Sequence, residues 1–242
     1  MTGALVAAAN AGAETILPVR DRLAVAARAI EPILNRVVLA GPPVVELLMN
    51  DQVVRAPALT FAADATLQLL TTSMVDRIGG DLQKLGLLRT GRSATADRWR
   101  VSDEVTLDLV QVRTDDADPD QVWLEYATLL TLPFTVDDRI TVRIAGAPAV
   151  IALECAAYLR SGEDAFDSER IERIVLLIAG RMEIEKECAA APPELRAIIA
   201  STLAPVVRGG SIQLLIQRAL PDAALVPALA RRIQERILRI AS

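Results

Sequence analysis

The stretch from residue 37 to residue 48 constrains the fold of this chain more than any other part of its sequence. It begins with Val37-Val38-Leu39-Ala40, a short apolar run rich in β-branched residues, which is typical of a buried strand. Gly41 follows, and then Pro42 and Pro43, which suit the first turn of a helix because its first N–H groups need no partner within the helix. The pattern predicts a buried strand, a tight turn at Gly41 and a helix that runs to about Leu48.

Two later segments have the character of strands, and each carries one aspartate. In residues 63–70 the polar residues Asp64, Thr66 and Gln68 alternate with apolar ones, which is the period of a strand with one buried side. In residues 105–110 the alternation places Val105, Leu107 and Leu109 on the inward face. Asp108 lies on the opposite face, with Thr106 and Val110. We therefore expect Asp64 and Asp108 to lie on adjacent strands, with their carboxylates near each other on one face of the sheet.

The remaining pattern divides the chain into a mixed part and a helical part. Residues 99–102 and 104–112 predict a hairpin, and residues 135–145 predict a further strand. Beyond that point the apolar spacing is helical throughout. Before that point, helices are expected at residues 19–30 and 72–85. After it, they are expected at residues 149–160, 169–179, 194–207, 212–219 and 224–240. The expected fold class is α+β: a mixed sheet with flanking helices in a domain of residues 17–146, followed by an all-helical domain of residues 147–242.

Composition excludes several classes of site. The chain has no histidine, which removes imidazole acid–base chemistry, Ser-His-Asp triads and His-based zinc sites. Cys155 and Cys188 stand in separate apolar helical contexts and predict buried, reduced thiols. The acidic residues 115–120 lack the spacing of a calcium-binding EF-hand loop and predict a solvated turn.

Charge and hydropathy limit the partners. The formal charge of −5 argues against a dominant nucleic-acid-binding surface. The sequence has no uncharged apolar run of about 18 residues, so we expect no membrane span. The N-terminal stretch has no basic region of the kind that opens a secretory signal, so we expect a cytoplasmic protein.

The order of these features resembles that of the toxin-type nucleotidyltransferases of bacterial abortive-infection and type IV toxin–antitoxin systems, in the polymerase-beta-like superfamily. The segments at residues 38–41, 55–70 and 105–110 carry the resemblance, and the helices after residue 147 agree with it in order and spacing. The resemblance implies a nucleotidyltransferase fold. It also implies a site in which three carboxylates hold Mg²⁺ against a nucleoside triphosphate, while the glycine turn brings N–H groups to the phosphates.

This sequence departs from the family pattern at the positions that carry the chemistry. The family's Asp-x-Asp has become Ala62-x-Asp64 or Asp64-x-Thr66, depending on the alignment, so one carboxylate is missing in either register. The residues after Gly41 are prolines, which have no N–H to offer a phosphate. These losses affect both the metal ligands and the phosphate cradle.

The helical part departs from the pattern as well. The position of a lysine in the family falls on Glu154, and acidic positions fall on Arg170 and Arg173. The exchanged signs predict an ion pair between Glu154 and one of the two arginines, beside the cleft.

The resemblance and its departures lead to two hypotheses. In the first, the protein is a catalytically degenerate nucleotidyltransferase fold, without a cofactor, that acts through a protein partner or through regulation. In the second, it is an active toxin that moves a nucleotide from an NTP to RNA, such as a tRNA-like acceptor, or to protein, with Mg²⁺ as cofactor. Nucleic acid is a partner only in the second. In either case Asp64 and Asp108 are the remnant catalytic and metal-binding carboxylates. The other cleft positions are Gly41, Thr66, Glu154, Arg170 and Arg173.

Overall fold

The computed structural model describes residues 18–51, 66–93, 95–113, 118–210, 212–220 and 227–241. Within these residues, seven strands form one mixed sheet in the order β3-β4-β5-β2-β1-β7-β6. The strands are β1 (Val38–Ala40), β2 (Leu67–Thr71), β3 (Leu88–Arg92), β4 (Asp97–Arg100), β5 (Thr106–Gln111), β6 (Thr131–Thr135) and β7 (Thr141–Ala145). Strand β1 pairs antiparallel with β2 and parallel with β7, and β2 pairs parallel with β5. The α+β class is confirmed.

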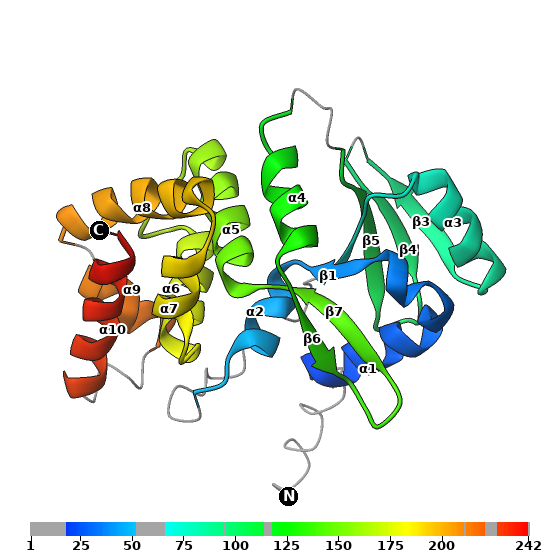
Figure 1. Ribbon diagram of the computed structural model, residues 1–242, viewed down its shortest axis with the longest axis horizontal. Helices are drawn as coiled ribbons and strands as arrows, with labels where there is room; N and C mark the ends of the chain where they lie inside the picture. The colour runs from blue at the N-terminus through cyan, green and yellow to red at the C-terminus, as the bar shows by residue number, and fades with distance from the viewer. Residues whose placement is uncertain are drawn as a thin grey trace, which may run out of the picture.

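Helices surround the sheet and then continue alone after Ala145 in the described residues (Figure 1). Those interleaved with the strands are α1 (Val19–Ala29), the 3₁₀-helix η1 (Glu31–Arg36), α2 (Pro42–Leu48), α3 (Val75–Lys84) and α4 (Gln121–Leu129). Those after the sheet are α5 (Ala147–Ser161), α6 (Glu169–Gly180), α7 (Ile184–Ala190), α8 (Pro193–Arg208), α9 (Ile212–Ala219) and α10 (Pro227–Ala241). The helical part joins the sheet through α5, which contacts α2, α4, α6 and α8.

The predicted strand–turn–helix unit lies at the centre of the molecule. The three residues of β1 are buried, as expected of a strand with neighbours on both sides, and α2 begins at Pro42 directly after the turn. Gly41 has φ +90°, a conformation that strongly favours glycine. The sequence therefore predicts this unit correctly.

The hairpin formed by β4 and β5 is also as predicted, and it separates two faces of the sheet. Trp99, Leu107 and Leu109 are fully buried. Trp99 packs against α3, where a Cβ at Gly79 would approach its ring within 3.1 Å. Asp108 alternates with these residues and therefore lies on the opposite face.

Three details differ from the predictions. Residues 135–145 are not one strand but the end of β6, a turn and β7, because Asp137 accepts hydrogen bonds from the N–H groups of Arg139 and Ile140 and reverses the chain. Ser168 precedes α6 as expected, but its buried hydroxyl makes no capping hydrogen bond with the described residues. The elements β3, α4 and α7 have no counterpart among the predictions.

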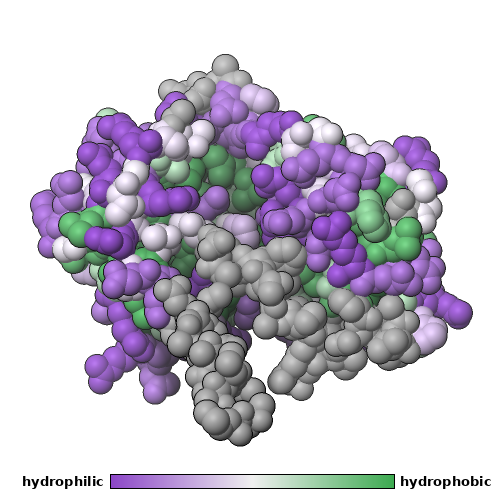
Figure 2. Space-filling model, turned by 180° about the vertical axis from the view of Figure 1, so that it is seen from behind, coloured by the Kyte–Doolittle hydropathy of each residue, from purple (hydrophilic) through white to green (hydrophobic). Residues whose placement is uncertain are grey.

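On the face seen in Figure 2, the described residues are mainly hydrophilic, and hydrophobic residues gather in several separate areas among them. Among the described residues no single helix combines the length and the apolar character that crossing a membrane requires, and only the bent pair α8 and α9 would meet both criteria if taken together.

Candidate functional site

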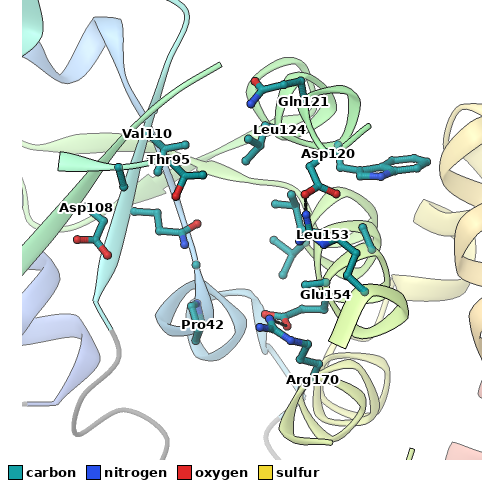
Figure 3. Close-up of a pocket in the computed structure, with 18 of the residues that line it drawn as sticks. Pro42, Thr95, Asp108, Val110, Asp120, Gln121, Leu124, Leu153, Glu154 and Arg170 are labelled. Carbon is teal, nitrogen blue, oxygen red and sulfur yellow. Dashed lines mark ion pairs between the residues drawn. The ribbon is translucent and has the colours of Figure 1, made fainter. Parts of the chain in front are cut away.

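A pocket of about 570 Å³ lies between the sheet and the helices α4, α5 and α6 (Figure 3). Its sheet side begins at the Gly41 turn and includes Gln68 and Asp108. Its helical side carries Glu154 and Arg170. The pocket therefore collects, from distant parts of the sequence, most of the positions that the sequence singles out.

The Gly41 turn is held close to the strand that follows it in the sheet. A Cβ at Gly41 would come within 3.1 Å of the Gln68 side chain and 3.3 Å of the Thr66 carbonyl oxygen. A larger residue here would be strained by the positive φ, and these neighbours would have to shift by a few tenths of an ångström. Thr66 lies just before β2, and its hydroxyl is 3.4 Å from that of Thr106.

The start of α2 offers few hydrogen-bond donors to the pocket. Pro42 and Pro43, its first two residues, have no N–H. The N–H of Val44, its third residue, donates to the carbonyl of Gly41 at 3.0 Å. None of the first three helical positions therefore has a backbone N–H free for an anion.

Strand pairing places three side chains in one row across the sheet. The parallel register of β2 and β5 aligns Gln68 with Asp108, and the antiparallel register of β4 and β5 aligns Arg98 with Asp108. The guanidinium of Arg98 donates to both carboxylate oxygens of Asp108, from Nε at 2.8 Å and from Nη2 at 2.9 Å. These hydrogen bonds raise the pKa of Arg98. The neighbours of Asp108 are thus a neutral amide and a paired cation.

Asp64, the other predicted carboxylate, lies outside the described residues. Its proximity to Asp108 stays a prediction. Within the described residues, those that approach the Gly41 turn most closely are Thr66 and Gln68, two positions apart. Neither is acidic.

The predicted ion pair of the helical side is present. Arg173 of α6 donates from Nε and Nη2 to the two carboxylate oxygens of Glu154 on α5, at 3.0 and 2.9 Å, and both residues are less than 9 % exposed. Arg170 lies farther away, with its Nη1 3.6 Å from Glu154 Oε2. The pair therefore forms a buried, charged contact between α5 and α6.

The upper part of the pocket contains residues that the sequence patterns do not single out. Asp120, just before α4, forms an ion pair with Arg160 at the end of α5. Trp123 and Leu124 of α4 line the same region. A loop between β3 and β4 adds Thr95 (Figure 3).

Arg98 is the most important residue that the sequence analysis missed, and a signal for it exists. A hairpin that turns symmetrically about Asp103 sets residue 98 opposite residue 108, as the observed register does. An arginine directly opposite an aspartate in such a pair is a favourable cross-strand contact.

A metal site is not evident in the described residues, where no three His, Cys, Asp or Glu side chains come together in a way that could hold an ion. The carboxylates that line the pocket are Asp108, Asp118, Asp120 and Glu154. Of these, Asp108, Asp120 and Glu154 form ion pairs with Arg98, Arg160 and Arg173.

No protein-family model matches this sequence, and a search of curated proteins gives no match. Among solved structures, the crystal structure of an antigenic nucleotidyltransferase-like protein from Paracoccidioides brasiliensis is similar, with a TM-score of 0.50 and 14 % sequence identity. The alignment covers 84 % of this chain and 92 % of that chain. At this identity the likeness concerns the fold alone: the chain has a nucleotidyltransferase-like fold.

Proposed function

We propose that this protein is a catalytically degenerate relative of the toxin-type nucleotidyltransferases of abortive-infection and type IV toxin–antitoxin systems, and that it acts by binding or regulating a protein partner. The start of α2 carries the proposal. A phosphate cradle at a helix N-terminus needs free N–H groups, and the first three positions of α2 supply none. Because this loss lies in the backbone, a change of side-chain rotamer does not repair it.

The charges around the pocket support the same conclusion. Four carboxylates and three guanidinium groups line it, so the pocket does not concentrate positive charge for a triphosphate. Asp108 already has Arg98 as its cation, and Gln68 beside it brings no charge. Mg²⁺ bound to a triphosphate is thus a poor fit for the described residues of this site.

The strength of the effect follows from the number of contacts that are missing. A charge-assisted hydrogen bond is worth about 1.5–3 kcal/mol, and every 1.4 kcal/mol changes affinity tenfold. Loss of two or three such contacts weakens triphosphate binding by roughly a hundredfold at the low end of this range and by more than a thousandfold over most of it. We therefore expect no saturable Mg²⁺-dependent ATP binding to the wild-type protein at 1 mM nucleotide, a concentration far above the Kd expected of an intact site.

The decisive experiment measures nucleotide transfer directly. Purified full-length protein is incubated with Mg²⁺, each of the four α-³²P-labelled NTPs, and either total tRNA or protein, and label on the acceptor is counted. We expect none. If label appears, and disappears in Asp108→Ala or Asp64→Ala, the protein is an active transferase and the alternative hypothesis replaces this one.

A reconstruction tests the backbone argument itself. Pro42→Ser with Pro43→Ala returns two N–H groups to α2, and Gln68→Asp returns a carboxylate beside Asp108. Helix α8 also begins at a Pro-Pro pair, so Pro192→Ser with Pro193→Ala is the matched control. We expect the triple variant to bind Mg²⁺-ATP measurably more tightly than wild type and the control to match wild type. Equal affinities for all three would show that the cradle does not limit binding.

A further inference from the structure

One arginine of the pocket is too far from its carboxylate partner to form a hydrogen bond with it. Both oxygens of Glu154 already accept hydrogen bonds from Arg173, and Arg170 stands at 3.6 Å, beyond hydrogen-bonding distance. Among the described residues, the Arg170 guanidinium makes no side-chain hydrogen bond. Its side chain is 39 % exposed and lines the pocket. Arg170 thus retains donors for an acceptor that the described part of the chain does not supply.

The surface above Arg170 is apolar. Helix α5 contributes Leu153 and, along the same wall, Val150, Ala156 and Ala157, while α4 contributes Trp123 and Leu124. Figure 3 shows Leu153 and Leu124 on the side of the pocket that faces the sheet, with Arg170 at its lower end. A volume of about 570 Å³ lies within the range of small-molecule sites, which combine apolar walls with a few polar anchors.

We propose that this pocket binds a small monoanion with an apolar or aromatic body, whose acid group is held by Arg170 and whose body lies against α4 and α5. The inference rests on the proposed function, because it assigns to the pocket a ligand other than a nucleoside triphosphate. Such a ligand is the means by which a degenerate site regulates a partner.

The charges that line the pocket favour a monoanion over a polyanion, a cation or a neutral molecule. A polyanion would find only one arginine of the lining with donors to spare, because the other two already pair closely with carboxylates. A cation finds Asp108, Asp120 and Glu154 already neutralised by arginines. A neutral apolar molecule would displace the water that hydrogen-bonds to Arg170 without replacing those hydrogen bonds, and the lost hydrogen bonds would weaken its binding. A ligand with a single negative charge would accept the hydrogen bonds that Arg170 still has to donate, and it would leave the other ion pairs intact.

Two fluorescent probes of the same shape separate charge from burial. 1-Anilinonaphthalene-8-sulfonate carries one negative charge, and N-phenyl-1-naphthylamine has the same rings without it. Energy transfer from tryptophan reports a nearby bound dye, and Trp123 lines the pocket, so the part of the signal that Trp123→Phe removes reports a dye in the pocket. The other tryptophan, Trp99, is buried on the other face of the sheet and gives a background that remains in this variant.

The expected result is specific to the charged probe. Arg170→Gln should weaken the binding of the sulfonate about three- to tenfold, a range that allows for the partial exposure of Arg170, and should leave the neutral dye unchanged. Arg170→Lys should keep most of the affinity. Arg77→Gln, an exposed arginine of α3 outside the pocket, should change neither dye.

Three results would overturn the inference: no transfer from Trp123 to the sulfonate in wild type, unchanged sulfonate affinity in Arg170→Gln, or equal weakening of both dyes. Its failure is distinct from that of the proposed function. A wild-type protein that transfers nucleotides refutes the proposed function, whereas a protein that transfers none and binds the sulfonate independently of Arg170 refutes only the ligand class.

Discussion

Loss of either partner in the Glu154–Arg173 pair should strongly destabilise the protein. The side chains are 10 % and 9 % exposed, and their two hydrogen bonds measure 2.9 and 3.0 Å. Glu154→Gln leaves the buried Arg173 guanidinium with only the exposed Glu169 carboxylate, at 3.5 Å. Arg173→Gln leaves the buried Glu154 carboxylate with only Arg170, at 3.6 Å. Breaking one side of a buried pair typically costs about 3–5 kcal/mol, which is a large part of the roughly 5–15 kcal/mol that holds a domain folded.

The double variant should be much less destabilised than the sum of the single variants. In Glu154→Gln/Arg173→Gln two neutral amides face each other, and no stranded charge remains. The coupling free energy of the cycle should therefore reach about 2–3 kcal/mol, at the upper end of values for residues in contact. Urea unfolding followed by far-UV circular dichroism gives each term, provided that the slope with denaturant stays constant among the variants.

An exposed pair of an arginine and a carboxylate provides the control. Arg28 and Asp137 make a single hydrogen bond of 3.0 Å, with side chains 62 % and 32 % exposed. Their cycle should give a much smaller coupling, because water screens both charges. A cycle of Glu154 with Arg170 should give a similarly small value, because that contact is longer and more open to water. If the Glu154–Arg173 coupling does not exceed that of the exposed pair, the idea of a packed, exchanged ion pair is wrong.

Three further expectations concern other parts of the chain. Gly41→Ala should lower the urea midpoint more than Gly86→Ala, because both positions have φ near +90° but only at Gly41 would a Cβ meet neighbouring atoms, at 3.1 and 3.3 Å; equal effects would mean that the turn is not tightly packed. Burial raises the pKa of the Cys155 and Cys188 thiols to about 12, so neither should react with a disulfide reagent at pH 8 until urea unfolds the protein, and a fast reaction of native protein would contradict their placement. Burial also raises the pKa of Glu46, so its charged form destabilises the fold. Glu46→Gln should therefore unfold at a higher urea concentration than wild type at pH 8. It should lose that advantage below the ordinary pKa of 4.5, and urea unfolding curves of both proteins at the two pH values would test this.

The parts of the fold that the sequence predicts are those in which burial and local chemistry agree. Strand β1 is an unbroken apolar run because it lies between two other strands, and Gly41 with two prolines marks the turn that follows. The helical part is predicted through its strong apolar periodicity and its Pro and Gly boundaries. In these segments the short-range pattern and the tertiary environment carry the same information.

The missed elements lack that agreement. All five residues of β3 are exposed, so no alternation distinguishes it from a loop, and its pairing with β4 is what makes it a strand. In α4 only Ala127 is fully buried, because much of the helix borders the pocket and solvent instead of the core. Such segments are specified by contacts with distant residues, which a reading of local patterns does not supply.

The candidate site divides in the same way. The Glu154 contact is expected only through the resemblance, which sets opposite charges at positions on two neighbouring helices, and the structure shows it between Glu154 and Arg173. The Arg98 contact depends on strand register, and the register of Thr66 and Gln68 beside Gly41 depends on how β2 meets the turn. A shift of two residues along a strand keeps the same face but moves a side chain by almost 7 Å, which is enough to exchange one ligand position for another.

The distribution of charge around the pocket links the fold to the proposed regulation. A site for phosphoryl or nucleotidyl transfer needs unbalanced positive charge and free N–H groups to meet a polyanion. In this pocket arginines neutralise Asp108, Asp120 and Glu154. The first two residues of α2 are prolines without an N–H, and the N–H of the third donates to the carbonyl of Gly41. The two walls come from the sheet and from α5 and α6, so a ligand that touches both adds contacts between them and stabilises that arrangement in proportion to its affinity. A partner that recognises the arrangement would then bind in a ligand-dependent manner, with no chemical step at the site.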